Sequence, residues 1–205
     1  MKHTYFISGI GTEVGKTIVS AIVTESLEAD YWKPVQAGDL DNSDTEKVRK
    51  LISNETSVFH ENAYALNTPM SPHAAAEIDD VKIQLSEIKA PKTKNYLVIE
   101  GAGGLLVPLN AKDCIIDLIK PDYRVILVSR HYLGSINHTL LSIEALKSRG
   151  LDCFGIIFSG EENKTTEAII KKMSAVPILG RIEQEPYFDK NVVLEYAEKF
   201  REKLG

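Results

Sequence analysis

The chain has 205 residues, enough to bury one sizeable hydrophobic core but too few for a comfortable second domain. Its net charge of −5 argues against a general nucleic-acid-binding protein, which normally carries a basic surplus. No apolar run approaches the ~18 residues of a membrane-spanning helix, and the N-terminus lacks a signal-peptide core. Only two cysteines occur. We therefore expect a cytoplasmic protein with reduced thiols that binds neither nucleic acid nor membranes.

Apolar, β-prone runs alternate with amphipathic helical patterns along the whole chain. Several runs are continuously apolar, as in parallel strands that are covered on both faces. We therefore expect one α/β domain over residues 1–205, with a mostly parallel sheet and helices on both faces. The predicted strands cover residues 4–8, 31–35, 96–99, 125–129, 154–158 and 177–179, and the weakly periodic segment 55–71 is expected to be a long surface excursion. Ligands of such sheets bind beyond the carboxyl ends of the strands, so the loops there should carry the chemistry.

Residues 9–17, directly after the first predicted strand, read GIGTEVGKT. A strand, a glycine-rich turn and Gly-Lys-Thr at a helix start form a phosphate-binding P-loop, in which backbone N–H groups point at the anion. The spacing is one residue longer than the standard pattern, and the alternative is a glycine-rich turn that only caps a helix. In a P-loop, Lys16 would reach the β- and γ-phosphates and Thr17 would bind Mg²⁺. We expect a P-loop NTPase-like fold whose loop binds nucleotide through Gly11, Thr12, Glu13, Val14, Gly15, Lys16, Thr17 and Ile18.

Charged side chains stand at the ends of two other predicted strands. Lys33 precedes Pro34 at a position that is normally apolar, and it is either a solvated surface lysine or a second phosphate-facing ammonium. Glu100 follows the strand at 96–99, where a buried carboxylate is costly unless it is paired or bound to metal. A metal-binding carboxylate occupies this position in P-loop proteins. The glycines after it, Gly103 among them, would let the backbone approach a nucleotide closely.

Two further loops carry candidate ligand contacts. The acidic turn at residues 39–44 ends in Asp44, which could face the phosphates and Mg²⁺; the alternative is helix capping by Asp41, Asn42 and Ser43. Residues 134–137 open a predicted helix, and their N–H groups could receive a carboxylate or phosphate unless Ser135 is an ordinary N-cap. No Ser/His/Asp or Cys/His hydrolase arrangement and no structural zinc spacing is present in the sequence.

Four blocks in this order, GIGTEVGKT, KPVQAG with NSD, IEGAGGLLVPL and LGSINH, together with Ser-Pro-His at residues 71–73, carry a family resemblance. From the first strand to about Phe158 the chain resembles the ATP-dependent dethiobiotin synthetases. That family uses CO₂ (from bicarbonate), ATP and Mg²⁺ to close a cyclic urea on 7,8-diaminononanoate. One amine takes up CO₂ as a carbamate, ATP phosphorylates the carbamate, and the second amine displaces phosphate.

The resemblance implies a role for each matching residue. Lys16 would act on the phosphates, Lys33 would stabilise the carbamate and the γ-phosphate, and Thr12 and Glu13 would line the site between substrate and phosphates; these four are the implied catalytic residues. The implied Mg²⁺ ligands are Thr17, Asp44 and Glu100, and Glu100 and Gly103 extend the nucleotide site. The implied substrate-binding residues are Lys33, Ala37, Ser71, Pro72, Gly104, Gly134, Ser135, Ile136 and Asn137. The last four would accept the substrate carboxylate across the interface of a homodimer.

The sequence differs from the family pattern at five positions. Gly11 stands where aspartate is common, Ala37 where a hydroxyl residue is usual, and Tyr132 where some members have lysine. Ser159 replaces an asparagine that reads adenine, and Glu183 stands where a proline often follows isoleucine. These differences concern the base and the substrate rather than the phosphates.

Two other functions share this kind of sheet. A nucleotide-switched, partner-binding ATPase of the partition or iron-protein type generally carries an additional lysine near the loop start, where this chain has Ile10 and Gly11. An amide-forming ligase such as the synthetase part of cytidine triphosphate synthase is usually followed by a glutaminase domain, for which we expect no room here. The cyclo-ligase is therefore the favoured interpretation.

Overall fold

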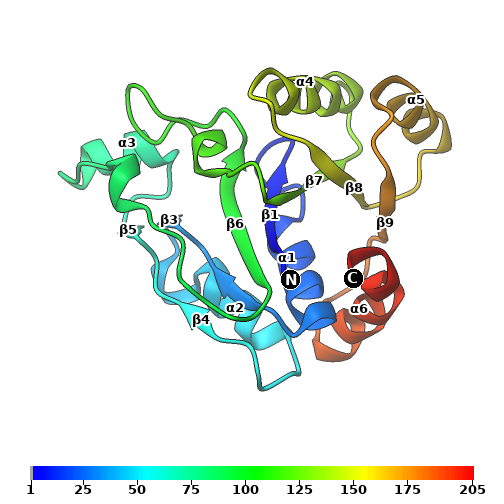
Figure 1. Ribbon diagram of the computed structural model, residues 1–205, viewed down its shortest axis with the longest axis horizontal. Coiled ribbons are helices and arrows are strands. Elements are labelled where there is room, and N and C mark those ends of the chain that lie inside the picture. The colour runs from blue at the N-terminus through cyan, green and yellow to red at the C-terminus, as the bar shows by residue number, and fades with distance from the viewer. Residues whose placement is uncertain (1) are drawn as a thin grey trace.

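The computed structural model describes residues 2–205, and within them seven parallel strands form one sheet in the order β4-β2-β6-β1-β7-β8-β9 (Figure 1). All registered strand pairs of this sheet are parallel. The α/β, mostly parallel fold predicted from the sequence is confirmed. The strands are β1 (Thr4–Gly9), β2 (Asp30–Trp32), β4 (Phe59–His60), β6 (Leu97–Gly104), β7 (Arg124–Arg130), β8 (Cys153–Ser159) and β9 (Ile178–Ile182).

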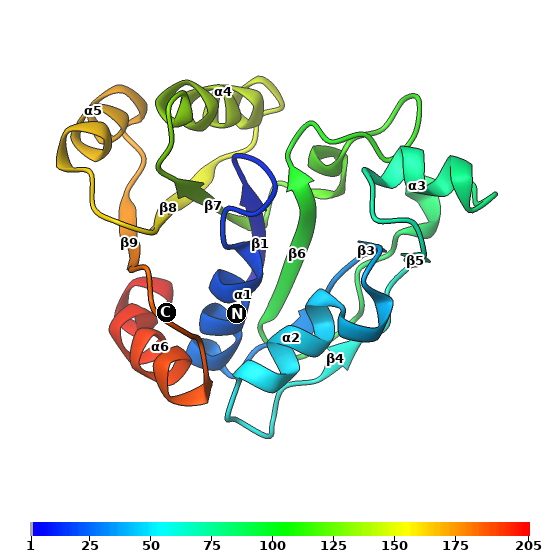
Figure 2. The same ribbon diagram turned by 180° about the vertical axis from the view of Figure 1, so that it is seen from behind.

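Helices cover both faces of this sheet, as predicted (Figures 1 and 2). On one face α1 (Lys16–Leu27) packs between α2 (Asp44–Leu51) and α6 (Lys190–Leu204). On the other face α4 (Ser135–Ser148) lies beside α5 (Lys164–Ser174). Gly150, with φ of 66°, follows the end of α4 in the left-handed conformation that the sequence predicted there. No helix of residues 2–205 is long and apolar enough to cross a membrane.

The strands are apolar on both sides because each side packs against a helical layer. Tyr5 and Ile7 of β1 belong to the cluster that faces α1 and α6, whereas Phe6 belongs to the cluster on the opposite face. All three side chains are fully buried. Alternate residues of a strand point to opposite faces, so a strand in the middle of this sheet needs a continuous apolar run.

The chain leaves the large sheet at Lys33, which corrects the single strand predicted for residues 31–35. Pro34 has no N–H to continue a ladder, and the next residues form β3 (Val35–Ala37). This strand pairs with β5 (Tyr64–Leu66) in a separate two-stranded sheet, against which α3 (Pro72–Ile78) packs. Lys33 is therefore placed at the junction between the two sheets.

Two other predicted boundaries are wrong. The expected surface excursion at residues 55–71 contains β4 and β5, which are too short to show a periodic pattern. Glu100 was expected in a loop but lies inside β6, because β1 continues beside that strand and Gly9 still pairs with Gly104. Short 3₁₀ turns at Leu40–Asn42, Leu85–Glu87 and Ile115–Leu118 complete the structure.

Candidate nucleotide and substrate site

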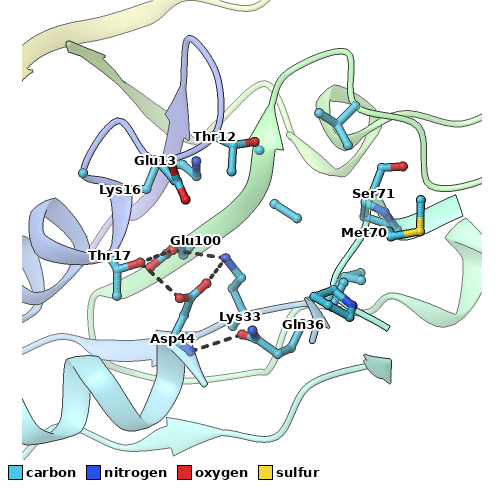
Figure 3. Close-up of a pocket in the computed structure, with 18 of the residues that line it drawn as sticks. Thr12, Glu13, Lys16, Thr17, Lys33, Gln36, Asp44, Met70, Ser71 and Glu100 are labelled. Atoms are coloured by element: carbon cyan, nitrogen blue, oxygen red, sulfur yellow. Dashed lines mark hydrogen bonds and ion pairs between the residues drawn. The ribbon is translucent and has the colours of Figure 1, made fainter. Parts of the chain in front are cut away.

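A cavity of about 770 Å³ opens where the carboxyl ends of β1, β2 and β6 meet (Figure 3). These strands are neighbours in the sheet, so segments far apart in sequence face one another across the cavity. Its walls combine a charged end with an apolar end. The lining residues are Thr12, Glu13, Gly15, Lys16, Thr17, Ile18, Lys33, Val35, Gln36, Ala37, Asp44, Pro69, Met70, Ser71, Pro72, Glu100, Ala102, Gly103 and Val107.

The loop between β1 and α1 has the backbone of an anion cradle. Gly15 is the N-cap of α1 with φ of 98°, and no side chain caps the helix. The free N–H groups of the first turn are therefore available to an anion. A Cβ at Gly15 would lie 2.9 Å from the Ser159 hydroxyl, so both its φ and its space require glycine. Glu13 adopts the left-handed conformation with φ of 57°, a strain of the kind that clusters at functional sites.

Lys16 lies buried at the start of α1 with its Nζ 2.9 Å from the Gly11 carbonyl oxygen. Burial lowers its pKa from 10.5 to about 8, and the Glu100 carboxylate offsets only part of that effect. A buried ammonium with one carbonyl partner gains strongly from an incoming phosphate.

Lys33, Asp44 and Glu100 form one ionic cluster, which Figure 3 shows at the charged end of the cavity. The Lys33 Nζ lies 2.6 Å from Asp44 Oδ2 and 3.1 Å from Glu100 Oε1, and it donates to the Gly101 carbonyl at 3.1 Å. Burial alone would lower the pKa of Lys33, but the carboxylates of Glu100 and then Asp44 outweigh it and raise the pKa. Lys33 is thus a fixed cation rather than the solvated lysine of the alternative interpretation.

Thr17 joins the same cluster and completes a set of hard oxygen donors. Its hydroxyl is 3.0 Å from Glu100 Oε1 and 3.3 Å from Asp44 Oδ1. Burial would raise the pKa of Asp44, yet Lys33 holds it below its ordinary value, so the carboxylate stays charged. One hydroxyl and two carboxylates beside a phosphate cradle fit Mg²⁺, which takes one or two protein carboxylates and fills its other positions with phosphate and water. Within residues 2–205 no group of three or more His, Cys, Asp and Glu side chains forms an all-protein metal site.

A family model described as an AAA domain matches residues 3–192. The ATP-dependent dethiobiotin synthetase of Christiangramia forsetii is 72% identical to this chain over 204 residues, covering 100% of the chain and 99% of the relative. The chain belongs to the ATP-dependent dethiobiotin synthetase family. The family's member from Cytophaga hutchinsonii is 50% identical and covers 95% of each chain.

Solved structures of other P-loop proteins share the fold of this dethiobiotin synthetase family member. A ParA family ATPase from Chlorobium tepidum superposes with a TM-score of 0.58 at 12% identity, covering 100% of this chain and 97% of that chain. A plasmid partition protein from Borrelia burgdorferi gives 0.60 at 15% identity, with 98% and 97% covered. At such identities the likeness shows the fold alone. Family membership therefore favours the cyclo-ligase interpretation over the partition-type switch.

Two polar residues of the site escaped the sequence analysis. The Tyr31 hydroxyl donates to Glu100 Oε2 at 2.9 Å, and burial, with the nearby Glu100 charge, raises the pKa of Tyr31 well above its ordinary value. Gln36 accepts from the Asp44 N–H at 3.2 Å and donates to the Gly38 carbonyl at 3.0 Å. Alternation along the strand gave a signal for Tyr31, because residues two apart share a face and Lys33 was already a candidate.

The start of α2 agrees with both interpretations of the acidic turn. Ser43 caps the helix, since its Oγ accepts from the Glu46 N–H at 3.3 Å. Asp44, the next residue, faces Lys33 and Thr17 instead of capping.

Some predicted site residues lie outside this cavity. Gly11 accepts from Lys16 through its carbonyl but does not line the cavity, Val14 is buried in the core, and Gly104 pairs with β1. Residues 134–137 open α4 away from the cavity, with Gly134, Ile136 and Asn137 exposed. Gly134, rather than Ser135, is the N-cap there, and no side chain caps the helix, so the N-cap alternative for Ser135 is wrong.

A groove of about 200 Å³ runs from Glu13 and Gly15 of the P-loop toward the ends of β8 and β9, and a second groove of about 230 Å³ lies beside it, at the ends of β7 and β8. Ser159, Gly160 and Gln184 line both, and Glu183 lines the one that borders Gly15 and Ile18. The departures from the family pattern at Ser159 and Glu183 therefore fall together beside the phosphate cradle.

Proposed function

We propose that this chain is the cyclo-ligase that converts 7,8-diaminononanoate and CO₂ to dethiobiotin with ATP and Mg²⁺, as one domain over residues 1–205 in the cytoplasm. Its near-complete coverage of dethiobiotin synthetases at up to 72% identity supports this assignment. The observation that carries it is the buried Lys33 ammonium, which lies where the charged end of the cavity passes into the apolar end.

The reaction joins two amines through one carbon. The first amine attacks CO₂, forms the N–C bond and loses a proton. A carbamate oxygen then attacks the γ-phosphorus, and ADP leaves. The second amine attacks the carbamoyl carbon of this mixed anhydride, the C–O bond to phosphate breaks, and a second proton is lost. The protein must hold three partners in line and balance the charge on the transferring phosphoryl group.

The phosphate end of the cavity suits the nucleotide. The α1 N-terminus would bind phosphate oxygens through residues 13–18, and Gly103 would leave room for them. The Lys16 ammonium would form charge-assisted hydrogen bonds with the β- and γ-phosphates. Thr17, Asp44 and Glu100 would hold Mg²⁺, and the bound ion would neutralise charge on those phosphates. The base would lie in the grooves near Ser159.

Lys33 would serve the carbamate and the γ-phosphate together. Its short contacts fix the ammonium in place, so little reorganisation is needed when negative charge builds up on the oxygen that bridges carbon and phosphorus. Thr12 and Glu13 border the same space and would orient the amines and the transferring group.

The apolar end of the cavity fits the hydrocarbon chain of the diamine. Val35, Ala37, Met70 and Val107 form its wall, and Figure 3 places Met70 and Ser71 across the cavity from Lys16. The Ser71 hydroxyl, held by His73 at 3.1 Å, supplies a polar group that Ala37 lacks. Pro72 and the backbone at Gly104 would border the substrate.

Among residues 2–205, Lys16 and Lys33 are the cations that line the cavity, and both are assigned to the phosphates and the carbamate, so the substrate carboxylate needs a donor from elsewhere. The uncapped first turn of α4, at Gly134, Ser135, Ile136 and Asn137, is suited to a carboxylate. Because that turn opens away from the cavity of its own chain, we propose a homodimer in which it completes the site of the partner subunit.

A coupled assay for ADP with diaminononanoate, ¹³C-bicarbonate and Mg·ATP tests the function. We expect ADP release that depends on the diamine and one ¹³C atom per dethiobiotin, detected by mass spectrometry. A nonanoate with only one amine is the matched control, because it can form a carbamate but cannot close the ring. Absence of diamine-dependent ADP release at millimolar diamine would contradict the assignment.

A further inference from the structure

Tyr31 is a fully buried tyrosine in the middle of β2. Its ring packs against Phe59, with the centroids 5.7 Å apart, and its backbone pairs with Val98 of β6. The side chain lies on the same face of the sheet as α1, next to the cluster of Lys33 and Glu100. This packing leaves the hydroxyl no route to solvent.

The two oxygens of Glu100 have different partners. Oε1 faces the cavity, where it accepts from Thr17 at 3.0 Å and from Lys33 at 3.1 Å. Oε2 is turned into the protein and accepts from the Tyr31 hydroxyl at 2.9 Å. Since Glu100 is only 1% exposed, Oε2 has no water to replace that donor. The division of partners fixes the rotation of the carboxylate group.

We propose that Tyr31 is a positioning residue for Glu100: its hydroxyl holds Oε2 and leaves Oε1 as the oxygen presented to Thr17, Lys33 and the Mg²⁺ of the nucleotide. The proposal deepens the proposed function and rests on it for the effect on turnover, but not for the effect on metal binding. Partners behind a metal ligand commonly change metal affinity or activity by about 10-fold to 100-fold when removed.

The alternative is that Tyr31 only fills the core and satisfies a buried carboxylate. A residue of that kind would lower the stability of the protein when changed and would leave metal affinity alone. The two roles therefore differ in a measurable way.

Tyr31→Phe removes the hydroxyl and keeps the ring. With saturating ADP, Mn²⁺ is titrated into wild type and variant, and free Mn²⁺ is followed by electron paramagnetic resonance. We expect the Mn²⁺ affinity to fall about 10-fold to 100-fold, while ADP affinity in EDTA stays within about twofold. In the ADP-release assay we expect kcat to fall and the KM for diamine to change little.

Tyr5→Phe is the matched control, because Tyr5 is also a fully buried strand tyrosine whose hydroxyl is bonded, but to Arg124 and the Leu204 carbonyl, near the C-terminus of the chain. It should lose thermal stability without losing Mn²⁺ affinity. A double-mutant cycle adds Glu100→Gln: in that background Tyr31→Phe should have no further effect on Mn²⁺.

Unchanged Mn²⁺ affinity in Tyr31→Phe, an equal loss in Tyr5→Phe, or a full additional loss in the Glu100→Gln background would each overturn the proposal. If wild type released no ADP with the diamine but Tyr31→Phe still weakened Mn²⁺ binding, the proposed function would fail and the positioning role would stand.

Discussion

The ion pair between Lys33 and Asp44 joins the end of β2 to the first turn of α2 at a distance of 2.6 Å. The Lys33 side chain is almost fully buried, whereas that of Asp44 is 22% exposed. The cluster holds the carboxylates of Asp44 and Glu100 against the single ammonium of Lys33, and the Lys16 ammonium lines the same cavity outside the cluster. Because Lys33 is the cation that both carboxylates share, we expect it to contribute to the stability of the protein as well as to turnover.

Lys33→Met should lower both the stability of the protein and its turnover, because it leaves Glu100 and Asp44 without their shared cation. Breaking a buried pair costs about 3 kcal/mol, which corresponds to a drop in Tm of about 6–12 °C for a chain of this size. We expect turnover to be lost while ADP binding stays largely intact. Calorimetry of unfolding, ADP titration and the ADP-release assay measure the three quantities.

The charge-balanced double variant Lys33→Met/Asp44→Asn is the control for this prediction. It removes one carboxylate with the ammonium, so part of the lost stability should return while turnover stays absent. If ADP binding fell together with turnover, Lys33 would be a nucleotide or folding residue and its proposed role at the carbamate would be wrong.

Lys16 should make the stability of the protein depend on pH above neutrality. Burial lowers its pKa to about 8 in the folded protein from an ordinary value of 10.5. Between these pH values the unfolded chain holds the proton and the native protein does not, so native stability rises with pH. Below pH 8 the full cost of burying the ammonium is present, about 3 kcal/mol for this shift.

Lys16→Met removes that titration. Relative to this variant, wild type should become more stable between pH 7 and pH 10, as measured by urea unfolding at both values. Lys172→Met, at an exposed lysine of α5, is the matched control for the replacement of a lysine by methionine. A difference between wild type and Lys16→Met that stays constant over this range would contradict the shift of the Lys16 pKa.

The parallel sheet and the placing of the candidate site beyond the strand ends followed from local patterns in the sequence. Apolar runs such as those around Phe6 and Leu127 mark doubly covered strands, and glycine spacing marks the turn after β1. Charged residues at strand ends, Lys33 and Glu100, pointed to the cavity because a buried charge needs a partner. These signals depend only on neighbouring residues, which is why the sequence carries them.

The contacts that the sequence did not predict depend on distant residues. Tyr31 reaches Glu100 across 69 positions, and the place where β2 ends depends on the pairing of β3 with β5 as well as on Pro34. β4 contributes only Phe59 and His60 to the sheet, so no alternation could reveal it. A two-residue strand forms only because β2 already lies beside it.

The region around the start of α4 should form the dimer interface. Tyr132, Leu133 and Ile136 are exposed there, and Leu133 has no neighbour that covers it. We expect wild type to be a dimer at micromolar concentration and Leu133→Asp to be a monomer, as measured by sedimentation velocity. The charge would be trapped against apolar surface of the partner subunit, which is costly.

Because the first turn of α4 would receive the substrate carboxylate in the partner's site, dissociation should also change kinetics. Leu133→Asp should raise the KM for diamine at least about 10-fold, the loss of roughly 1.4 kcal/mol that one charge-assisted contact supplies, while ADP binding stays unchanged. Met173→Asp, at an exposed apolar residue of α5, is the matched control and should remain dimeric with an unchanged KM. If wild type stayed monomeric at about 100 µM, far above ordinary dimer dissociation constants, residues 134–137 would not contribute to the substrate site. A dimeric Leu133→Asp with normal KM would place the interface on another surface.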